Sequence, residues 1–130
     1  MAVTHHNDVK KAIADAVLAE IDGNTGAADL VLQTAGTVAV ATLVFNDPAA
    51  PAASTTGVLT FDNTPTIEDT NATGNASPVT KFVIRSGTNV EKVYGSVGTA
   101  TPTDDIALSS TTIGAGDTVQ VTSLTYTAPP

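Results

Sequence analysis

The chain has 130 residues, no cysteine and a formal net charge of −8 at pH 7, with a pI near 4.2. These values exclude disulfides and cysteine-based zinc sites, and they disfavour binding to nucleic acid or to an anionic membrane because both would repel the chain. Hydrophobic residues make up 42% of the chain and aromatic residues only 4%, so we expect one domain with a core of Val, Leu, Ile and Ala.

The charge distribution leaves two interpretations open. No Lys or Arg lies between Ala12 and Thr80, so most of the first two thirds of the chain is acidic or neutral. The acidity serves either solubility alone or complementarity to a basic surface of a partner.

Residues 1–6 predict a flexible N-terminal arm, and residues 7–130 a single β-rich domain. The pair His5-His6 in the arm is too small a set to predict a metal site. The arm lacks the basic start and apolar run of a signal peptide, and the longest apolar-rich stretch, residues 38–45, is too short to span a bilayer. We expect a chain that is made in a cytoplasm, stays soluble and does not bind a membrane.

Residues 7–22 predict the one α-helix of the chain. Asn7 suits the N-cap position, Asp8 favours the first turn, and Gly23 suits the residue after the helix. We expect the apolar stripe of this helix to pack on the chain's own sheet, with an interface to another molecule as the alternative. At helical spacing the stripe contains Val9, Ala12, Ile13, Ala16, Val17 and Ile21.

After the helix the apolar residues alternate, which predicts strands. We expect strands over residues 30–33, 37–45, 58–62, 66–69, 80–85 and 90–97, a hairpin turn at 86–89, a short strand at 106–108, a tight turn at 114–117 and a last strand at 118–127. The apolar phase of the last strand slips by one residue near Thr122-Ser123, which indicates a β-bulge or a change of sheet. The pattern predicts a mainly β fold, namely an antiparallel β-sandwich or flattened barrel of about seven to eight strands with one N-terminal α-helix.

No set of residues predicts catalysis, so we expect that the chain is not an enzyme and has no catalytic, cofactor-binding or metal-binding residue. The acid pairs Glu68-Asp69 and Asp104-Asp105 are adjacent in sequence, and adjacent strand residues point to opposite faces. A divalent ion bound by such a pair stays an alternative, although no calcium-binding loop is present. The glycines of residues 114–116 lack the Lys-Thr and the βαβ setting of a nucleotide-binding loop.

Five segments occur in an order that is typical of one group of proteins. They are residues 21–27 (Ile-Asp-Gly-Asn-Thr-Gly-Ala), 30–33 (Leu-Val-Leu-Gln), 41–49 (Ala-Thr-Leu-Val-Phe-Asn-Asp-Pro-Ala), 95–99 (Gly-Ser-Val-Gly-Thr) and 116–125 (Gly-Asp-Thr-Val-Gln-Val-Thr-Ser-Leu-Thr). In this order the chain resembles the small virion structural proteins of tailed bacteriophages, in particular the head decoration or cement proteins. The resemblance covers residues 7–128, departs at 49–77, and implies no catalytic residue.

The resemblance implies a capsid decoration (cement) protein that binds the outer surface of the phage head shell and stabilises it. Its partners would be the major capsid protein and further copies of itself in a small oligomer, reached through edge strands or the N-terminal arm. It would be made in the cytoplasm of the host bacterium and lie on the head of the virion. The alternative is a tail or head-tail connector protein, and the scarcity of aromatic residues disfavours a carbohydrate-binding module.

Overall fold

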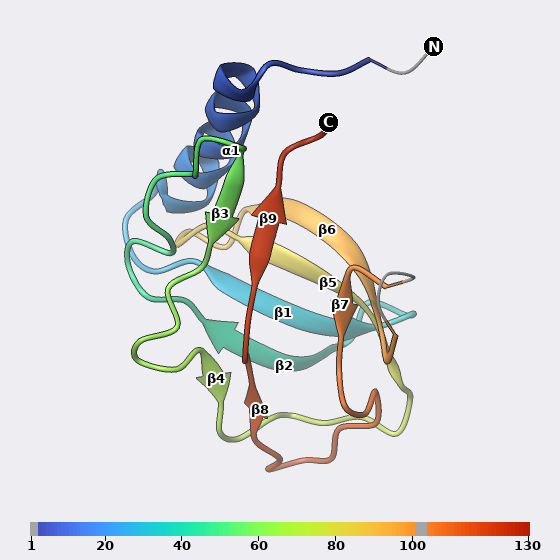
Figure 1. Cartoon of the computed structure of the whole chain (residues 1–130). Coiled ribbons are helices and arrows are strands. Elements are labelled where there is room, and N and C mark those ends of the chain that lie inside the picture. The colour runs from blue at the N-terminus through green and yellow to red at the C-terminus, as the bar shows by residue number, and fades with distance from the viewer. Residues whose placement is uncertain (1–2, 101–103) are drawn as a thin grey trace.

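The computed structural model describes residues 3–100 and 104–130 and contains, within them, one helix followed by nine strands (Figure 1). The elements are α1 (Asn7–Asp22), β1 (Asp29–Thr34), β2 (Ala39–Val44), β3 (Val58–Thr60), β4 (Glu68–Asp69), β5 (Val79–Arg85), β6 (Glu91–Gly98), β7 (Ile106–Ala107), β8 (Val119–Gln120) and β9 (Thr125–Thr127). The prediction of a mainly β fold with one N-terminal helix is confirmed.

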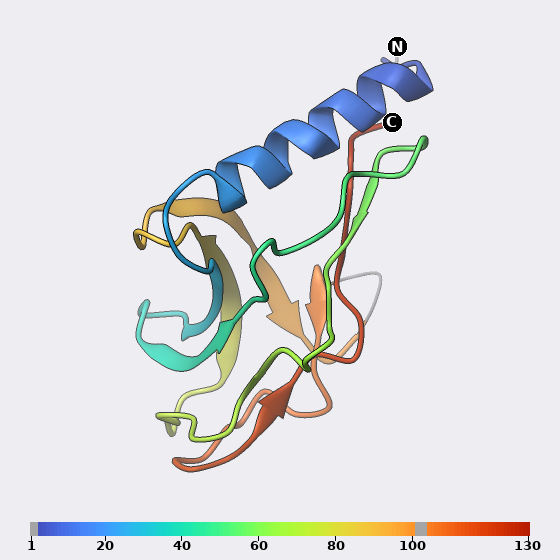
Figure 2. The ribbon, with the colours of Figure 1, turned by 90° about the vertical axis from the view of Figure 1, so that its left-hand side faces the viewer.

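The largest part of the fold is a curled five-stranded sheet of order β2-β1-β5-β6-β7, which forms a half-barrel (Figure 2). Two short ladders, β3–β9 and β4–β8, pack against the same core. The first four strands of the sheet are antiparallel neighbours, but β7 runs parallel to β6, so the prediction of a wholly antiparallel sheet is wrong. Alternating apolar residues look the same in parallel and antiparallel pairs, so the pattern does not encode strand direction.

Asp105 holds β7 beside β6. Its carboxylate accepts hydrogen bonds from the Ser96 backbone N–H (2.8 Å) and hydroxyl (3.1 Å), and its own N–H donates to the Ser96 hydroxyl oxygen (3.0 Å). The neighbouring Asp104 accepts from the N–H of Ala100 (3.2 Å). Both acid side chains therefore fix the position of the chain as it enters β7.

The core lies between the inner face of the curled sheet and the two short ladders. Leu32 and Leu43 from the sheet and Ile67 from the opposite side are each almost fully buried. The rings of Phe45 and Phe61 lie 4.9 Å apart between centroids and join the end of β2 to the segment after β3. Apart from these two rings and the buried Phe82, the core is aliphatic, as the composition predicts.

A bulge interrupts the predicted alternation in β2. Leu32 pairs with Ala41 and Gln33 with Ala39, so Val40 has no partner residue on β1. Val40 and Ala41 are consequently both buried, although the alternation predicts opposite faces for them.

The last predicted strand is divided at the place where its apolar phase slips. β8 pairs with β4, β9 pairs with β3, and residues 121–124 connect the two ladders. The phase slip near Thr122-Ser123 predicts a β-bulge or a change of sheet, and the structure has the change of sheet.

The helix packs through a narrower face than the sequence predicts. Ala14 and Ile21 are buried, whereas Val9 is 44% exposed and Ala12 and Ala16 are exposed as well, so the prediction that these three residues face the sheet is wrong. Ala14 contacts a small cluster at the β3–β9 end, and Ile21 enters the main core. Figure 2 shows the helix lying across one end of the molecule, with its N-terminal half above β3 and the C-terminal segment.

Both helix ends differ in detail from the prediction. The N-cap is His6 rather than Asn7, and its Nδ1 accepts a hydrogen bond from the Asp8 N–H (3.3 Å). Gly23 ends the helix in a right-handed conformation (φ −68°), and the left-handed residue comes later, at Gly26 (φ 93°). A β-carbon on Gly23 would lie 2.5 Å from the carbonyl oxygen of Ala19, which explains why glycine stands there.

Asp22 fastens the end of the helix to the loop after β2. Its two carboxylate oxygens lie 3.0 and 3.2 Å from the N–H of the buried Ala49, which donates to them. Burial raises the pKa of the Asp22 carboxyl above its ordinary value, and this outweighs the hydrogen bond from Ala49, which lowers it.

A partly buried ion pair joins the first residue of β1 to the last residue of β5. Asp29 of β1 lies directly opposite Arg85 of β5, and the guanidinium donates from Nε to one carboxylate oxygen (2.8 Å) and from a terminal nitrogen to the other (2.6 Å). The side chains are 13% and 28% exposed, so this bidentate pair is screened less than a surface pair. Its hydrogen bonds raise the pKa of Arg85 further.

We predict that Asp29→Ala lowers the free energy of unfolding by about 2 kcal/mol, because it leaves the partly buried guanidinium of Arg85 without its acceptor. Urea denaturation measures the change. The control is the double variant Asp29→Ala/Arg85→Met, which removes both charges and should recover part of the loss. An unchanged denaturation midpoint for Asp29→Ala would contradict the prediction.

Part of the predicted N-terminal arm is described. Met1 and Ala2 lie outside the described residues, and residues 3–6 precede the helix without regular structure. Nδ1 of His5 lies 2.7 Å from the carbonyl oxygen of Pro130, so this contact joins the arm to the C-terminal segment.

Candidate docking groove

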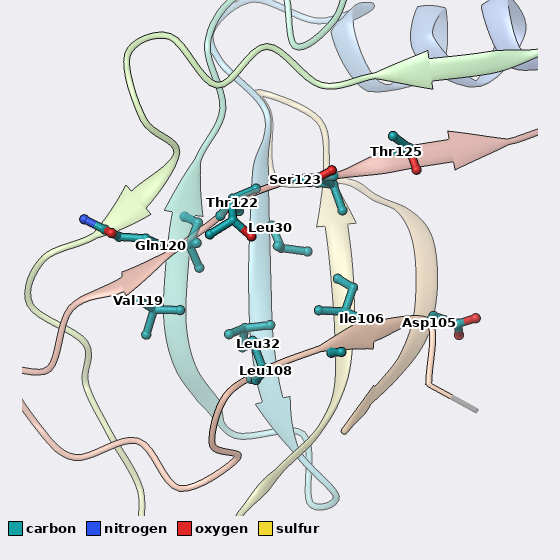
Figure 3. Close-up of a pocket in the computed structure, with 14 residues that line it drawn as sticks. Leu30, Leu32, Asp105, Ile106, Leu108, Val119, Gln120, Thr122, Ser123 and Thr125 are labelled. Atoms are coloured by element: carbon teal, nitrogen blue, oxygen red, sulfur yellow. The ribbon is translucent and has the colours of Figure 1, made fainter. Parts of the chain in front are cut away.

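A groove opens into the core where the curled sheet ends. One wall is β7 with the residues beside it, and the other is the segment 119–125, which contains β8 and the start of β9. Figure 3 shows Leu30 and Leu32 of β1 between these walls. The central hollow has a volume of about 260 Å³.

The groove extends beyond this hollow in both directions. A second hollow of about 350 Å³ shares Ala107, Gln120 and Thr122 with the first and continues toward Asp117. A third hollow of about 320 Å³ shares Ile106 and Thr125 with the first. The three hollows adjoin one another along β7 and the C-terminal segment, and together they are called the groove below.

The groove has the core beneath it and polar residues at its rim. Leu30, Leu32 and Leu43 lie beneath it and are each at most 2% exposed, so they belong to the core and offer a partner almost no surface. The accessible apolar surface comes from partly exposed residues of the two walls, namely Ile106, Leu108, Val119, Val121 and Leu124. At the rim Thr122, Ser123 and Thr125 are exposed. Apolar side chains beside exposed strand backbone are an arrangement that suits an extended polypeptide chain.

The groove is also acidic. Asp105 lies toward one end and Asp117 toward the other, and no Lys or Arg occurs in the sequence after Lys92. The Asp117 carboxylate accepts a hydrogen bond from the Gly114 N–H (2.7 Å), as the Asp105 carboxylate does from Ser96, so both charges are held in fixed places. Neither aspartate forms an ion pair within the described residues.

The residues that the sequence singled out do not form a site together. Glu68 accepts a hydrogen bond from the Gln120 side chain (2.8 Å), whereas Asp69 accepts one from the Thr42 N–H (2.9 Å) on the neighbouring strand β2. His5 and His6 bond to Pro130 and to the start of the helix, respectively. Within the described residues, no group of three or more His, Asp or Glu side chains is placed to hold a metal ion.

The glycine-rich residues 114–116 form the tight turn that the sequence predicts. The Asp117 N–H donates to the Gly114 carbonyl (3.1 Å), and Gly116 has a φ of 85°. Gly116 donates from its N–H to the carbonyl of Ala72 (2.8 Å), so the turn is fixed to the loop at residues 71–77.

Sequence reasoning did not find the groove. The phase slip at Thr122-Ser123 marks one wall, but it does not reveal which segment lies opposite. The other wall depends on the parallel pairing of β7, and alternation carries no signal for that pairing.

Comparisons of the chain with protein-family models, with curated proteins and with solved structures found no match. Among residues 3–100 and 104–130, no helix combines the length and apolar character needed to cross a membrane.

Proposed function

We propose that this chain is a decoration protein of a tailed-phage head, which binds the outer surface of the shell and stabilises it. Its partner is the major capsid protein, and its copies associate with one another in a small oligomer. It acts through contacts rather than as an enzyme. In this proposal it is made in the cytoplasm of the host bacterium and lies on the head of the virion.

The observation that carries the proposal is the acidic groove between two strand edges. A sheet edge presents N–H and C=O groups that another chain can pair with, and an edge beside partly exposed apolar side chains offers both affinity and register. The resemblance of the segments between residues 7 and 128 supplies the biological setting. The acidity supports a place on the outer surface, because packaged DNA would repel a chain with a net charge of −8.

The description of the fold as a sandwich or flattened barrel is part of this proposal. The curled sheet and the ladders β3–β9 and β4–β8 share one core, which supports a flattened barrel. The groove would then be the open seam of the barrel, and a partner chain would close it.

The test compares particles assembled with and without this chain. We expect particles that lack it to release DNA at a lower temperature, and purified protein added back to restore the resistance, because many copies repeat a weak contact over one shell. Equal DNA retention with and without the chain would contradict a stabilising role. Labelled protein found only along the tail would contradict the head location and favour a tail or connector protein.

A further inference from the structure

We propose that the groove between β7 and residues 119–125 binds an extended segment of the shell protein as an added β-strand. This segment has small apolar side chains at alternate positions and Lys or Arg at its ends. The identity of the partner rests on the proposed function, whereas the mode of binding rests on the groove itself.

The first argument is the second edge of β7, which pairs with no strand among residues 3–100 and 104–130. This strand is the last in the sheet order, and Ile106 and Ala107 pair with Val97 and Gly98 of β6. The N–H of Leu108 donates to the Gly98 carbonyl (2.8 Å). Consecutive residues of a strand direct their backbone groups to opposite sides, so Ala107 directs its N–H and C=O away from β6 and into the groove.

The second argument is the opposite wall. β8 pairs with β4 and β9 pairs with β3, each on the side away from β7. Between these ladders, Val121 donates from its N–H to the Ile67 carbonyl (2.9 Å), and the Phe61 N–H donates to the Leu124 carbonyl (3.0 Å). The bonds of this wall therefore point away from the groove, and the exposed Thr122 and Ser123 leave its inner side open.

The third argument is the match between the groove and a strand of defined chemistry. A strand between the walls would direct every second side chain inward, against the partly exposed Ile106, Leu108 and Val121, which favours small apolar residues there. Asp105 and Asp117 toward the two ends favour basic residues in the bound segment. No basic side chain from residues 93–130 competes with them.

The test uses the full-length chain and the blocked peptide Lys-Val-Thr-Val-Thr-Val-Lys. We expect backbone amide resonances of residues 105–108 and 119–125 to shift on titration, and exchange of the Ala107 amide hydrogen to slow. A peptide with Glu in place of both Lys residues, and one with a central Pro, should bind more weakly. The proposal is overturned if no amide of the groove shifts, or if the same amides shift with protein concentration alone, which would make a second copy the occupant.

The variant Ala107→Pro sharpens the test. It removes the N–H that faces the groove and keeps the Leu108 bond to β6, so the fold should persist, as an unchanged melting temperature would verify. Peptide affinity should fall roughly tenfold, the loss expected for about one backbone hydrogen bond. The matched variant Ala107→Val changes the same wall position but retains the N–H, so it should lose less peptide affinity than Ala107→Pro does. Equal affinity of Ala107→Pro and the parent chain would overturn the proposal.

Binding to phage heads separates this inference from the proposed function. If the parent chain binds the peptide in the groove but does not bind heads, the decoration function is wrong and strand addition stands. If Ala107→Pro binds heads as well as the parent chain does, the groove is not the docking site, whereas the decoration function stands.

Discussion

Replacing Ala14 by aspartate should lower the free energy of unfolding by about 3–5 kcal/mol, the cost of a buried charge without a partner. Ala14 is fully buried at the place where α1 meets the β3–β9 layer. Its cluster contains Ala53, Leu59 and Ala128, none of which offers a side-chain hydrogen bond. The helix would have to move away from this layer to hydrate the carboxylate.

Ala12→Asp is the matched control, because it makes the same substitution on the exposed face of the same helix. Both variants change helix propensity and charge in the same way, so the difference between their free energies of unfolding reports the effect of burial alone. Urea denaturation followed by circular dichroism measures both. Similar midpoints for the two variants would show that α1 does not depend on packing at Ala14, which would contradict the observed arrangement.

The helix illustrates which features the sequence determines. The structure confirms its limits, residues 7–22, although His6 rather than Asn7 is the N-cap. Its buried face agrees with the prediction only in part. Ile13, Val17 and Ile21 of the predicted stripe pack on the two clusters, whereas Val9, Ala12 and Ala16 are exposed. Packing also uses Ala14, which the stripe does not contain and whose small side chain lets the helix backbone approach β3 closely. A β-carbon on Gly57 would lie 2.8 Å from the backbone of Lys10, which shows how tight this approach is.

The strands show why the sequence located most of the sheet but not the groove. Apolar alternation located β1, β2, β5 and β6, and the phase slip located the break between β8 and β9. Alternation is a local property and cannot specify that β7 returns parallel to β6. The acid residues near β7 were considered as ion ligands, whereas Asp104 and Asp105 accept backbone hydrogen bonds that hold the wall of the groove.

Replacing Gly74 by alanine should cost about 2–4 kcal/mol of stability, from left-handed backbone strain together with overpacking. Gly74 has a φ of 72° and donates from its N–H to the carbonyl of Val40 (3.0 Å), the residue in the β2 bulge. An added β-carbon would lie 2.5 Å from the carbonyl carbon of Gly114, and it would also contact the backbone nitrogen of Ala115. Neither atom can move without displacing the turn at residues 114–117.

Alanine variants at two other glycines separate the backbone strain from the overpacking. Gly116 has a similar left-handed φ of 85°, but a β-carbon there would lie 3.9 Å from its nearest neighbour, Oδ1 of Asn71, so Gly116→Ala should cost only the backbone strain, about 1 kcal/mol. At Gly36, which is not left-handed, the nearest atom would lie 3.8 Å away, so Gly36→Ala should change stability little. The urea midpoint should therefore be highest for Gly36→Ala, lower for Gly116→Ala and lowest for Gly74→Ala. If Gly74→Ala and Gly116→Ala lost equal stability, the contact between residue 74 and the turn at 114–117 would contribute nothing, and this turn would be free to move away from β2.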